Sequence, residues 1–312
     1  MSGMRDELRI HTDRAVRQVK GVPDNRGFAV AMLLAVVALY MATGKLTQGA
    51  EPEPAKLHAS TLEAFGRYVR LTESRNAEEL KRGANLLWID ELPGAERAEA
   101  YAALKSGEVK MKKLEMRDGG KEIPCPGGII HHWVGVILIP GAKLEDVLGM
   151  LEDYDKHYIY FAPDVERSKM ESRNGDRFRV FLRFRRHKVI TVVLNTEHEI
   201  EYFRDGPERA HSRSSAVRIA EVENAGKKDE REKPPGEDGG FLWRMETWWR
   251  MEERDGGVYV QSEVVSLTRD IPAMLKWLIE PFVTSIPKET LSATLVATRK
   301  TVQARVATQR GR

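Results

Sequence analysis

The chain has 312 residues, of which 41% are apolar and 31% charged, a mixture that suits a folded core and excludes collagen-like and wholly disordered classes. Its single cysteine, Cys125, excludes a disulfide scaffold. The formal charge of +3 lies in the first 50 residues, which hold seven Lys/Arg and four Asp/Glu and leave 43 of each sign elsewhere. Nucleic-acid binding needs an excess of positive charge, so we expect none by the main body.

The N-terminal region contains a membrane-directing segment. Residues 28–44 (FAVAMLLAVVALYMATG) carry no charge and follow a basic arm, residues 1–27. A transmembrane helix takes about 17–25 apolar residues and a signal-peptide core about 7–15, so both interpretations stay open. We expect an uncleaved single-pass helix in a bacterial inner membrane, with the arm in the cytoplasm and the body in the periplasm. The alternative is secretion after signal cleavage near Ala50.

Residues 45–107 are predicted to form a tether followed by a helical segment. Leu62, Phe65 and Val69 recur at helical spacing, and a second helix over residues 95–103 ends before Gly107. The apolar stripe is too thin for an independent core. We expect these helices to pack on the following domain or to stand between it and the membrane.

The main domain, residues 108–312, is predicted to be rich in strands. Residues 129–139 (IIHHWVGVILI) are almost continuously apolar, as in a strand covered on both faces, and an amphipathic helix follows over residues 144–154. Asn174-Gly175, the strongest short hairpin signal, separates strands over residues 165–172 and 176–185. Further strands are predicted over residues 108–116, 189–203, 210–222, 241–253 and 258–267.

The C-terminal part combines a charged loop with a long helix. Residues 225–239 (AGKKDEREKPPGEDG) are predicted to be a poorly ordered loop. The helix carries an apolar stripe that includes Leu291 and Leu295, has Pro287 near its start, and follows a shorter, broken helical piece at Pro272 and Pro281. The predicted fold class is therefore α+β.

This order of elements, together with the passage Tyr154-Asp155-Lys156-His157-Tyr158-Ile159-Tyr160-Phe161-Ala162-Pro163-Asp164-Val165-Glu166-Arg167-Ser168, resembles the helix-grip superfamily of START domains, polyketide cyclases and birch allergens. The resemblance covers about residues 128–305. It implies a curved antiparallel sheet wrapped around the long C-terminal helix, with a cavity between them for lipids, isoprenoids or other apolar molecules. The superfamily includes enzymes and ligand carriers and has no shared catalytic signature to transfer.

Two strands and the last helix place large apolar side chains where such a cavity would be. In a strand, alternate residues share a face, and pockets are mostly apolar with few polar groups. The candidate cavity residues are Phe178, Val180, Leu182, Phe184, Trp243, Met245, Thr247, Trp249, Leu291 and Leu295. The alternative is that these side chains fill a packed core.

The sequence offers little for catalysis or metal binding. His131 and His132 are neighbours on a strand, so they point to opposite faces and cannot bind one ion. His198 points away from Glu197 and Glu199 for the same reason, although a carboxylate of another strand could meet it. We therefore predict no catalytic residue, no metal site and no cofactor.

A basic stripe follows one strand. It consists of Arg177, Arg179, Arg183, Arg185, Arg186 and Lys188. Such a row could contact anionic lipid head groups, or it could pair across strands with Glu197, Glu199, Glu246 and Glu252; we favour pairing.

The predicted function is binding of an apolar small molecule or lipid, without covalent chemistry, by a START-like domain that residues 28–44 attach to the membrane. The alternatives are an enzyme of the cyclase or aromatase type, and a protein-interaction module whose core is filled. The sequence identifies no protein partner.

Overall fold

A computed structural model describes residues 56–187, 191–234, 237–271 and 273–311, with the backbone alone for residues 273–284. The chain divides into two units, Met1–Glu53 and Pro54–Arg312. The predicted arm 1–27 and apolar segment 28–44 lie outside the described residues, so the predicted anchor and location stay predictions. Within the described part, no helix combines the length and apolar character needed to cross a membrane.

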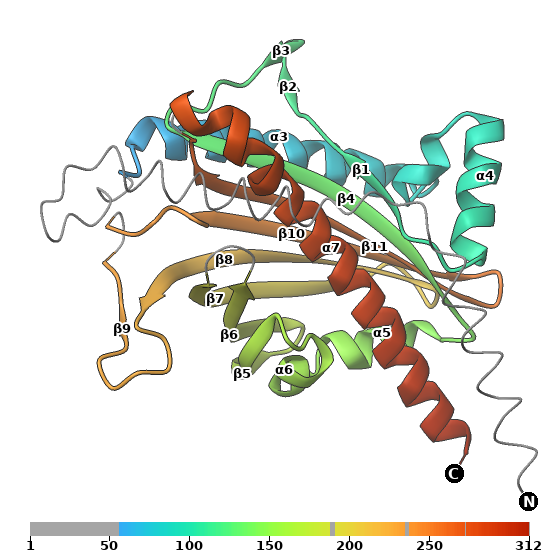
Figure 1. Ribbon diagram of the computed structural model, residues 1–312. Helices are drawn as coiled ribbons and strands as arrows, with labels where there is room; N and C mark the ends of the chain where they lie inside the picture. Colours follow the sequence, from blue (N-terminus) through green and yellow to red (C-terminus); the bar gives the residue numbers. More distant parts are fainter. Residues whose placement is uncertain (1–55, 188–190, 235–236, 272, 312) are drawn as a thin grey trace, which may run out of the picture. The chain divides into compact units, whose positions relative to one another are not determined.

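An antiparallel sheet forms the centre of the second unit (Figure 1). Its strands follow the order β1-β4-β11-β10-β8-β7-β6-β5, with β9 paired to β8 outside this path, and β2 and β3 form a separate hairpin. The bounds are β1 Lys110–Lys113, β2 Arg117–Asp118, β3 Lys121–Glu122, β4 Gly128–Pro140, β5 Val165–Asn174, β6 Arg177–His187, β7 Thr191–Arg204, β8 Arg209–Glu223, β9 Arg231–Glu232, β10 Arg244–Arg254 and β11 Gly257–Arg269.

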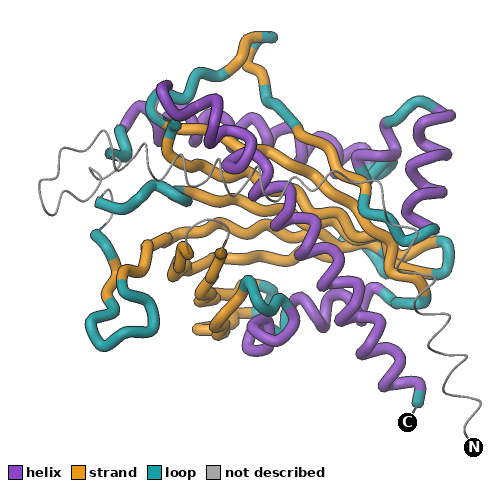
Figure 2. Tube along the Cα trace, viewed as in Figure 1, coloured by secondary structure: helices purple, strands orange, loops and turns teal. Residues whose placement is uncertain are grey.

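Helices cover both faces of this sheet. They are α3 (Ala59–Arg82), the short η1 (Trp88–Glu91), α4 (Gly94–Lys105), α5 (Leu144–Leu151), η2 (Tyr154–Lys156), α6 (His157–Tyr160) and α7 (Ala273–Arg310). Figures 1 and 2 show α7 along one face and α3 along the other. We call the face toward α7 the inner face and the face toward α3 the outer face.

The predicted α+β class and helix-grip arrangement are confirmed. The first long strand, β4, pairs with the last, β11, and α5 and α6 follow β4 before the other strands. The predicted broken piece ahead of the C-terminal helix is wrong, because α7 runs unbroken through Pro281 and Pro287. A proline inside a helix costs about 3 kcal/mol, which the packing of the helix on the sheet offsets.

The C-terminal half of α7 packs closely on the inner face. Leu291, Leu295 and Val302 are buried in one apolar cluster with side chains of β4, β10 and β11. Gly135 of β4 makes this approach possible, since a Cβ there would lie 2.7 Å from Leu295 Cδ1. A side chain on that residue would push the helix off the sheet.

The outer face is covered by the helical segment that precedes the sheet. Phe65, Tyr68 and Val69 of α3 pack with Trp248, Val265 and Leu267 in a second apolar cluster. A third cluster joins η1 and α4 to β4 and β11. Of the two places predicted for these helices, packing on the following domain is therefore the one observed.

A chain of buried polar groups links α3 to the outer face. Tyr68 accepts a hydrogen bond from the Met116 N–H at 2.9 Å and lies 3.0 Å from His132 Nδ1, while His132 Nε2 lies 2.7 Å from Glu263 Oε1. Arg75 pairs with the same carboxylate. Burial lowers the pKa of His132, so a neutral ring that accepts at Nδ1 and donates from Nε2 satisfies every partner.

The Glu263 carboxylate in this row of buried polar groups is ionised. Burial alone would raise its pKa, but the hydrogen bond from His132 and the charge of Arg75 outweigh burial and lower the pKa below its usual value. Beside it, Arg250 donates hydrogen bonds to the Leu86 carbonyl at 2.9 Å and, at 2.6 Å, to Asn76 and Glu79 of α3. We call Arg75, Arg250, Glu79, Glu263 and His132 the outer ionic cluster.

The charged loop predicted over residues 225–239 is held on the sheet in its described part. Arg183 binds both carboxylate oxygens of Glu230, at 2.8 and 2.9 Å, and β9 pairs with β8. Asp238 accepts a hydrogen bond of 2.9 Å from Trp243 Nε1. The charged composition predicted disorder because composition does not show that a buried arginine of β6, Arg183, pairs with one of the loop's carboxylates, Glu230.

Candidate functional site

Strand registers order the side chains of the inner face into rows. In an antiparallel pair, directly opposed residues point to the same face. A first row contains Tyr202, Ser212, Trp249, Ser262 and Gly135, and a middle row contains Ile200, Ser214, Thr247, Val264 and Trp133. A last row contains His198 with Ala216, and Met245 with Ser266 and His131.

The middle row is partly accessible to solvent although it crosses the centre of the sheet. Its half-buried members are Ser214, Thr247, Val264 and Trp133. The outer-face neighbours Val134, Trp248 and Val265 on the same strands are buried. Side chains packed under a covering layer lose their solvent contact, so this difference indicates space on the inner side.

Around its residues 288–290, α7 touches strands near both ends of the sheet. Lys288 Nζ lies 5.7 Å from the centre of the Trp133 ring on β4, and Arg186 of β6 donates a hydrogen bond of 2.9 Å to Thr290 Oγ1. In a flat sheet, β4 and β6 would be about 24 Å apart, whereas a helix is about 10–12 Å across. The sheet therefore curves around α7.

Hydroxyl groups lie among the apolar side chains of the inner face. Ser212 and Ser262 flank Trp249 in the first row, each is 1% exposed, and neither hydroxyl has a hydrogen-bond partner in the described part of the chain. Thr247, the polar residue predicted for the cavity, lies in the neighbouring row. A mostly apolar surface with a few hydroxyls suits an uncharged ligand.

Two buried histidines belong to the last row. Nε2 of His198 lies 2.8 Å from Thr196 Oγ1, so His198 meets a hydroxyl where a carboxylate was considered. Burial lowers the pKa of His198 to about 4, and burial with the charge of Lys113 lowers that of His131 to about 4. Both rings are neutral at pH 7. No group of three or more metal-ligating side chains occurs in the described residues.

Stability is expected to fall between about pH 6.5 and pH 4. In this window the unfolded chain binds protons on histidines that stay neutral in the folded protein, and His198 contributes up to about 1.4 kcal/mol per pH unit. Urea unfolding at pH 7, 6 and 5 measures the decrease. The substitution His198→Asn is expected to make it shallower, and an unchanged pH dependence would contradict a neutral, buried His198.

The predicted cavity residues divide between packed core and accessible surface. Phe178, Val180, Leu291 and Leu295 are buried in the inner cluster, whereas Leu182, Phe184, Met245, Thr247 and Trp249 are half-buried. Trp243 lies elsewhere, buried with Phe65 and Tyr68 in the second apolar cluster, on the outer face. It precedes β10, which begins at Arg244, so the alternation of the strand does not extend to it.

Sequence reasoning missed several members of the rows. Ser212, Ser214 and Ser262 were not candidates, because serine in a polar strand gives no sign of facing a helix. The alternation places Ser212 and Ser214 on one face of their strand. Only the register with β10 shows that this face is the inner one.

The basic stripe is paired across strands. Arg177 binds Glu201 and Arg179 binds Glu197, both at 2.8 Å, and Glu166 binds Arg183 at 3.0 Å and Arg185 at 2.9 Å. Arg186 pairs with Asp164. Pairing is confirmed for these five arginines, but of the four predicted partners only Glu197 and Glu199 meet the stripe, since Glu246 bonds to Ser215 and Glu252 binds Arg209 and Arg254. Lys188 lies outside the described residues.

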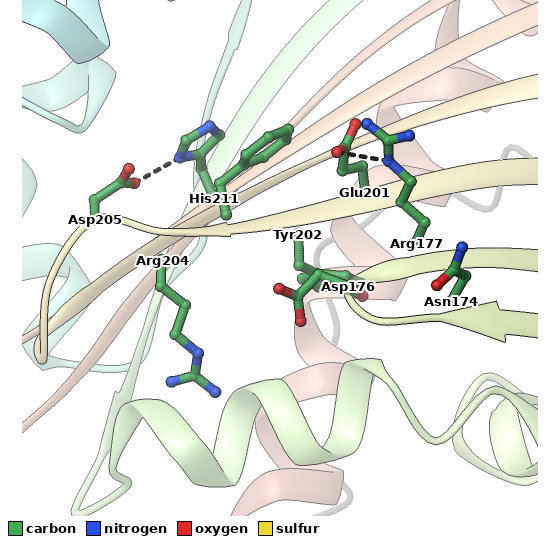
Figure 3. Close-up of a pocket in the computed structure, with 9 residues that line it drawn as sticks. Asn174, Asp176, Arg177, Glu201, Tyr202, Arg204, Asp205 and His211 are labelled. Atoms are coloured by element: carbon green, nitrogen blue, oxygen red, sulfur yellow. Dashed lines mark hydrogen bonds and ion pairs between the residues drawn. The ribbon is translucent and has the colours of Figure 1, made fainter.

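A surface pocket lies at the ends of β6 and β7, near α5 (Figure 3). Its charged walls are paired: Arg177 binds Glu201, His211 Nδ1 lies 2.5 Å from Asp205, and Arg204 binds Glu145. The lining mixes both signs, with three carboxylates, Asp176 included, against two arginines, and most of these charges are already paired, so we place the candidate site on the inner face.

No family model matches this chain, and no curated protein matches it. Solved structures do match in fold. A STAR-related lipid transfer protein of Xanthomonas axonopodis is 18% identical over 61% of this chain and 98% of its own, with a TM-score of 0.40. An aromatase/cyclase of a Streptomyces species is 12% identical over 57% and 96%, with a TM-score of 0.38.

A START superfamily protein of Mycobacterium smegmatis is 11% identical over 57% of this chain and 97% of its own, with a TM-score of 0.35. The TM-scores of these matches are below 0.5, so the helix-grip arrangement of this chain rests on its own strand order. What the inner face does must be argued from its own residues.

Proposed function

We propose that this domain binds an apolar ligand between the inner face and α7 and performs no covalent chemistry on it. The observation that carries the proposal is the partial solvent exposure of the middle row, Ser214, Thr247, Val264 and Trp133, whereas the outer-face neighbours Val134, Trp248 and Val265 on β4, β10 and β11 are buried. Burial of apolar ligand surface against Val264 and the neighbouring Trp249 would supply the binding free energy.

Two features favour binding over the alternatives. A cyclase-type enzyme needs an acid or base close to its substrate, with a pKa near the working pH. Burial lowers the pKa values of His198 and His131 to about 4, so at pH 7 they are weak bases and lack the imidazolium proton that an acid would donate. An interaction module with a filled core would bury the middle row, and that row is half-buried.

Binding can be tested on the full-length protein with Nile red, a neutral dye that brightens in apolar surroundings. Ser214→Phe places a ring in the accessible space and is expected to weaken dye binding at least about tenfold. Val217→Phe adds the same ring at a residue of β8 that is 47% exposed and is expected to leave binding unchanged.

The same comparison of dye binding can contradict the proposal. Equal dye binding by the wild type and Ser214→Phe, with both folded by circular dichroism, would contradict a ligand site on the inner face. Thr247→Leu is a second, milder block of the middle row should the phenylalanine disturb folding. Solvent extraction of the purified protein followed by mass spectrometry would then identify a bound molecule.

A further inference from the structure

Packing alone does not explain why two buried residues of the inner face are serines. Ser212 of β8 and Ser262 of β11 stand directly on either side of Trp249 of β10, and all three face α7. Both hydroxyls are buried without a partner among the described side chains, whereas Ser215, on the outer face of β8, is bonded to Glu246. An unpaired buried hydroxyl destabilises the protein that carries it, while alanine would remove this cost.

The strand side chains around these hydroxyls are uncharged. Among the described side chains of the three rows, the only titratable groups besides Tyr202 are His131 and His198, whose pKa values burial lowers to about 4. Tyr202 is itself buried, with its hydroxyl 2.7 Å from that of Tyr154. A charged ligand group would find no counter-ion among these strand side chains, and the cation that α7 brings to the rows, Lys288, lies 5.7 Å from the Trp133 ring. Burying a charged group unpaired would cost far more than burying a neutral group.

We propose that Ser212 and Ser262 form a hydrogen-bonding subsite for a neutral apolar ligand that carries a hydroxyl or carbonyl oxygen. This inference rests on the proposed function and adds the chemical class of the ligand. A ligand oxygen would satisfy a hydroxyl that the protein leaves unpaired, so the serines are costly in the free protein and favourable in the complex.

Trp249 controls access to this subsite. Its side chain lies between the two serines in the row and is half-buried, whereas both hydroxyl oxygens are covered. Adjacent strands are about 4.8 Å apart, so the serines stand roughly 9–10 Å from each other. A ligand oxygen reaches one of them when the indole shifts toward the other.

Three probes with one carbon skeleton test the inference on the full-length protein by competition with Nile red. They are 2-naphthol, 2-methylnaphthalene and 2-naphthoate, which present a hydroxyl, a methyl group and a carboxylate at the same position. The wild type is expected to bind 2-naphthol about three- to tenfold more tightly than 2-methylnaphthalene and to bind 2-naphthoate least.

Variants assign that preference to the serines. The double variant Ser212→Ala/Ser262→Ala is expected to bind 2-naphthol and 2-methylnaphthalene equally and to raise the Tm of the unliganded protein by about 2–4 °C. The control Ser215→Ala removes a paired hydroxyl, so it is expected to lower the Tm and to keep the preference for 2-naphthol.

The outcomes separate this inference from the proposed function. Binding of the probes with no preference for 2-naphthol, or with a preference that survives in the double variant, would overturn the subsite and leave the proposed function standing. Tightest binding of 2-naphthoate would overturn the neutral ligand class. A protein that binds none of the probes and no Nile red contradicts the proposed function and this inference with it.

Discussion

Replacing Glu263 by alanine is expected to lower the free energy of unfolding by about 3–5 kcal/mol. The carboxylate is 3% exposed and accepts from both His132 and Arg75, so its removal leaves a half-buried guanidinium with one partner fewer and a buried imidazole N–H with none. Removing one partner of a buried ion pair has a cost of this size because the remaining charge stays out of water. Urea unfolding at pH 7 measures the loss.

Two other substitutions show whether the buried charge is the cause. Glu263→Gln keeps an oxygen for His132 and removes the charge, so it is expected to lose less than the alanine. Glu199→Ala removes an exposed carboxylate 3.6 Å from Arg179 and is expected to change stability by less than about 0.5 kcal/mol. A loss below about 1 kcal/mol for Glu263→Ala would mean that Arg75 reaches water without it.

Replacing Leu295 by alanine is expected to lower the free energy of unfolding by about 2–5 kcal/mol. The side chain is fully buried between α7 and the sheet, so truncation removes apolar contacts and leaves a void where the helix meets β4. Urea unfolding at pH 7 measures this loss as well. The matched control is Val296→Ala, because Val296 is the next residue of the helix and its side chain is 41% exposed.

A second substitution identifies the partner of Leu295. Gly135→Ala alone is expected to cost about 1–3 kcal/mol, because its Cβ would lie 2.7 Å from Leu295 Cδ1. In the Leu295→Ala background that atom is gone, so the double variant is expected to lose less than the sum of the two single losses. Additive losses would place the close contact elsewhere.

The sequence predicts the elements of this fold where a local signal suffices. Asn174-Gly175 marks the turn between β5 and β6, and Gly175 has the positive φ of 61° that such a turn requires. The stripe of Leu291 and Leu295 correctly predicts the face of α7 that is buried. These signals act over a few residues, so composition and spacing capture them.

What the sequence does not predict depends on partners far along the chain. Glu263 pairs with Arg75, which lies 188 positions away in the sequence, and the residue types alone do not predict a buried ion pair. The inner-face role of Ser212 likewise depends on its register with Trp249 of another strand. Alternation shows which residues share a face, but pairing between strands decides which face meets α7 and which meets α3.

The outer ionic cluster determines from which side a molecule can reach the inner face. Lifting α3 would strip Arg250 of its bonds to Asn76 and Glu79, at a cost of several kcal/mol. On the other side, α7 contacts the two rims of the sheet through Lys288 with Trp133 and Thr290 with Arg186, each contact worth about 1 kcal/mol or less. Under the proposed function, the N-terminal helices would therefore form a fixed wall behind the sheet, and a ligand would enter along the edges of α7.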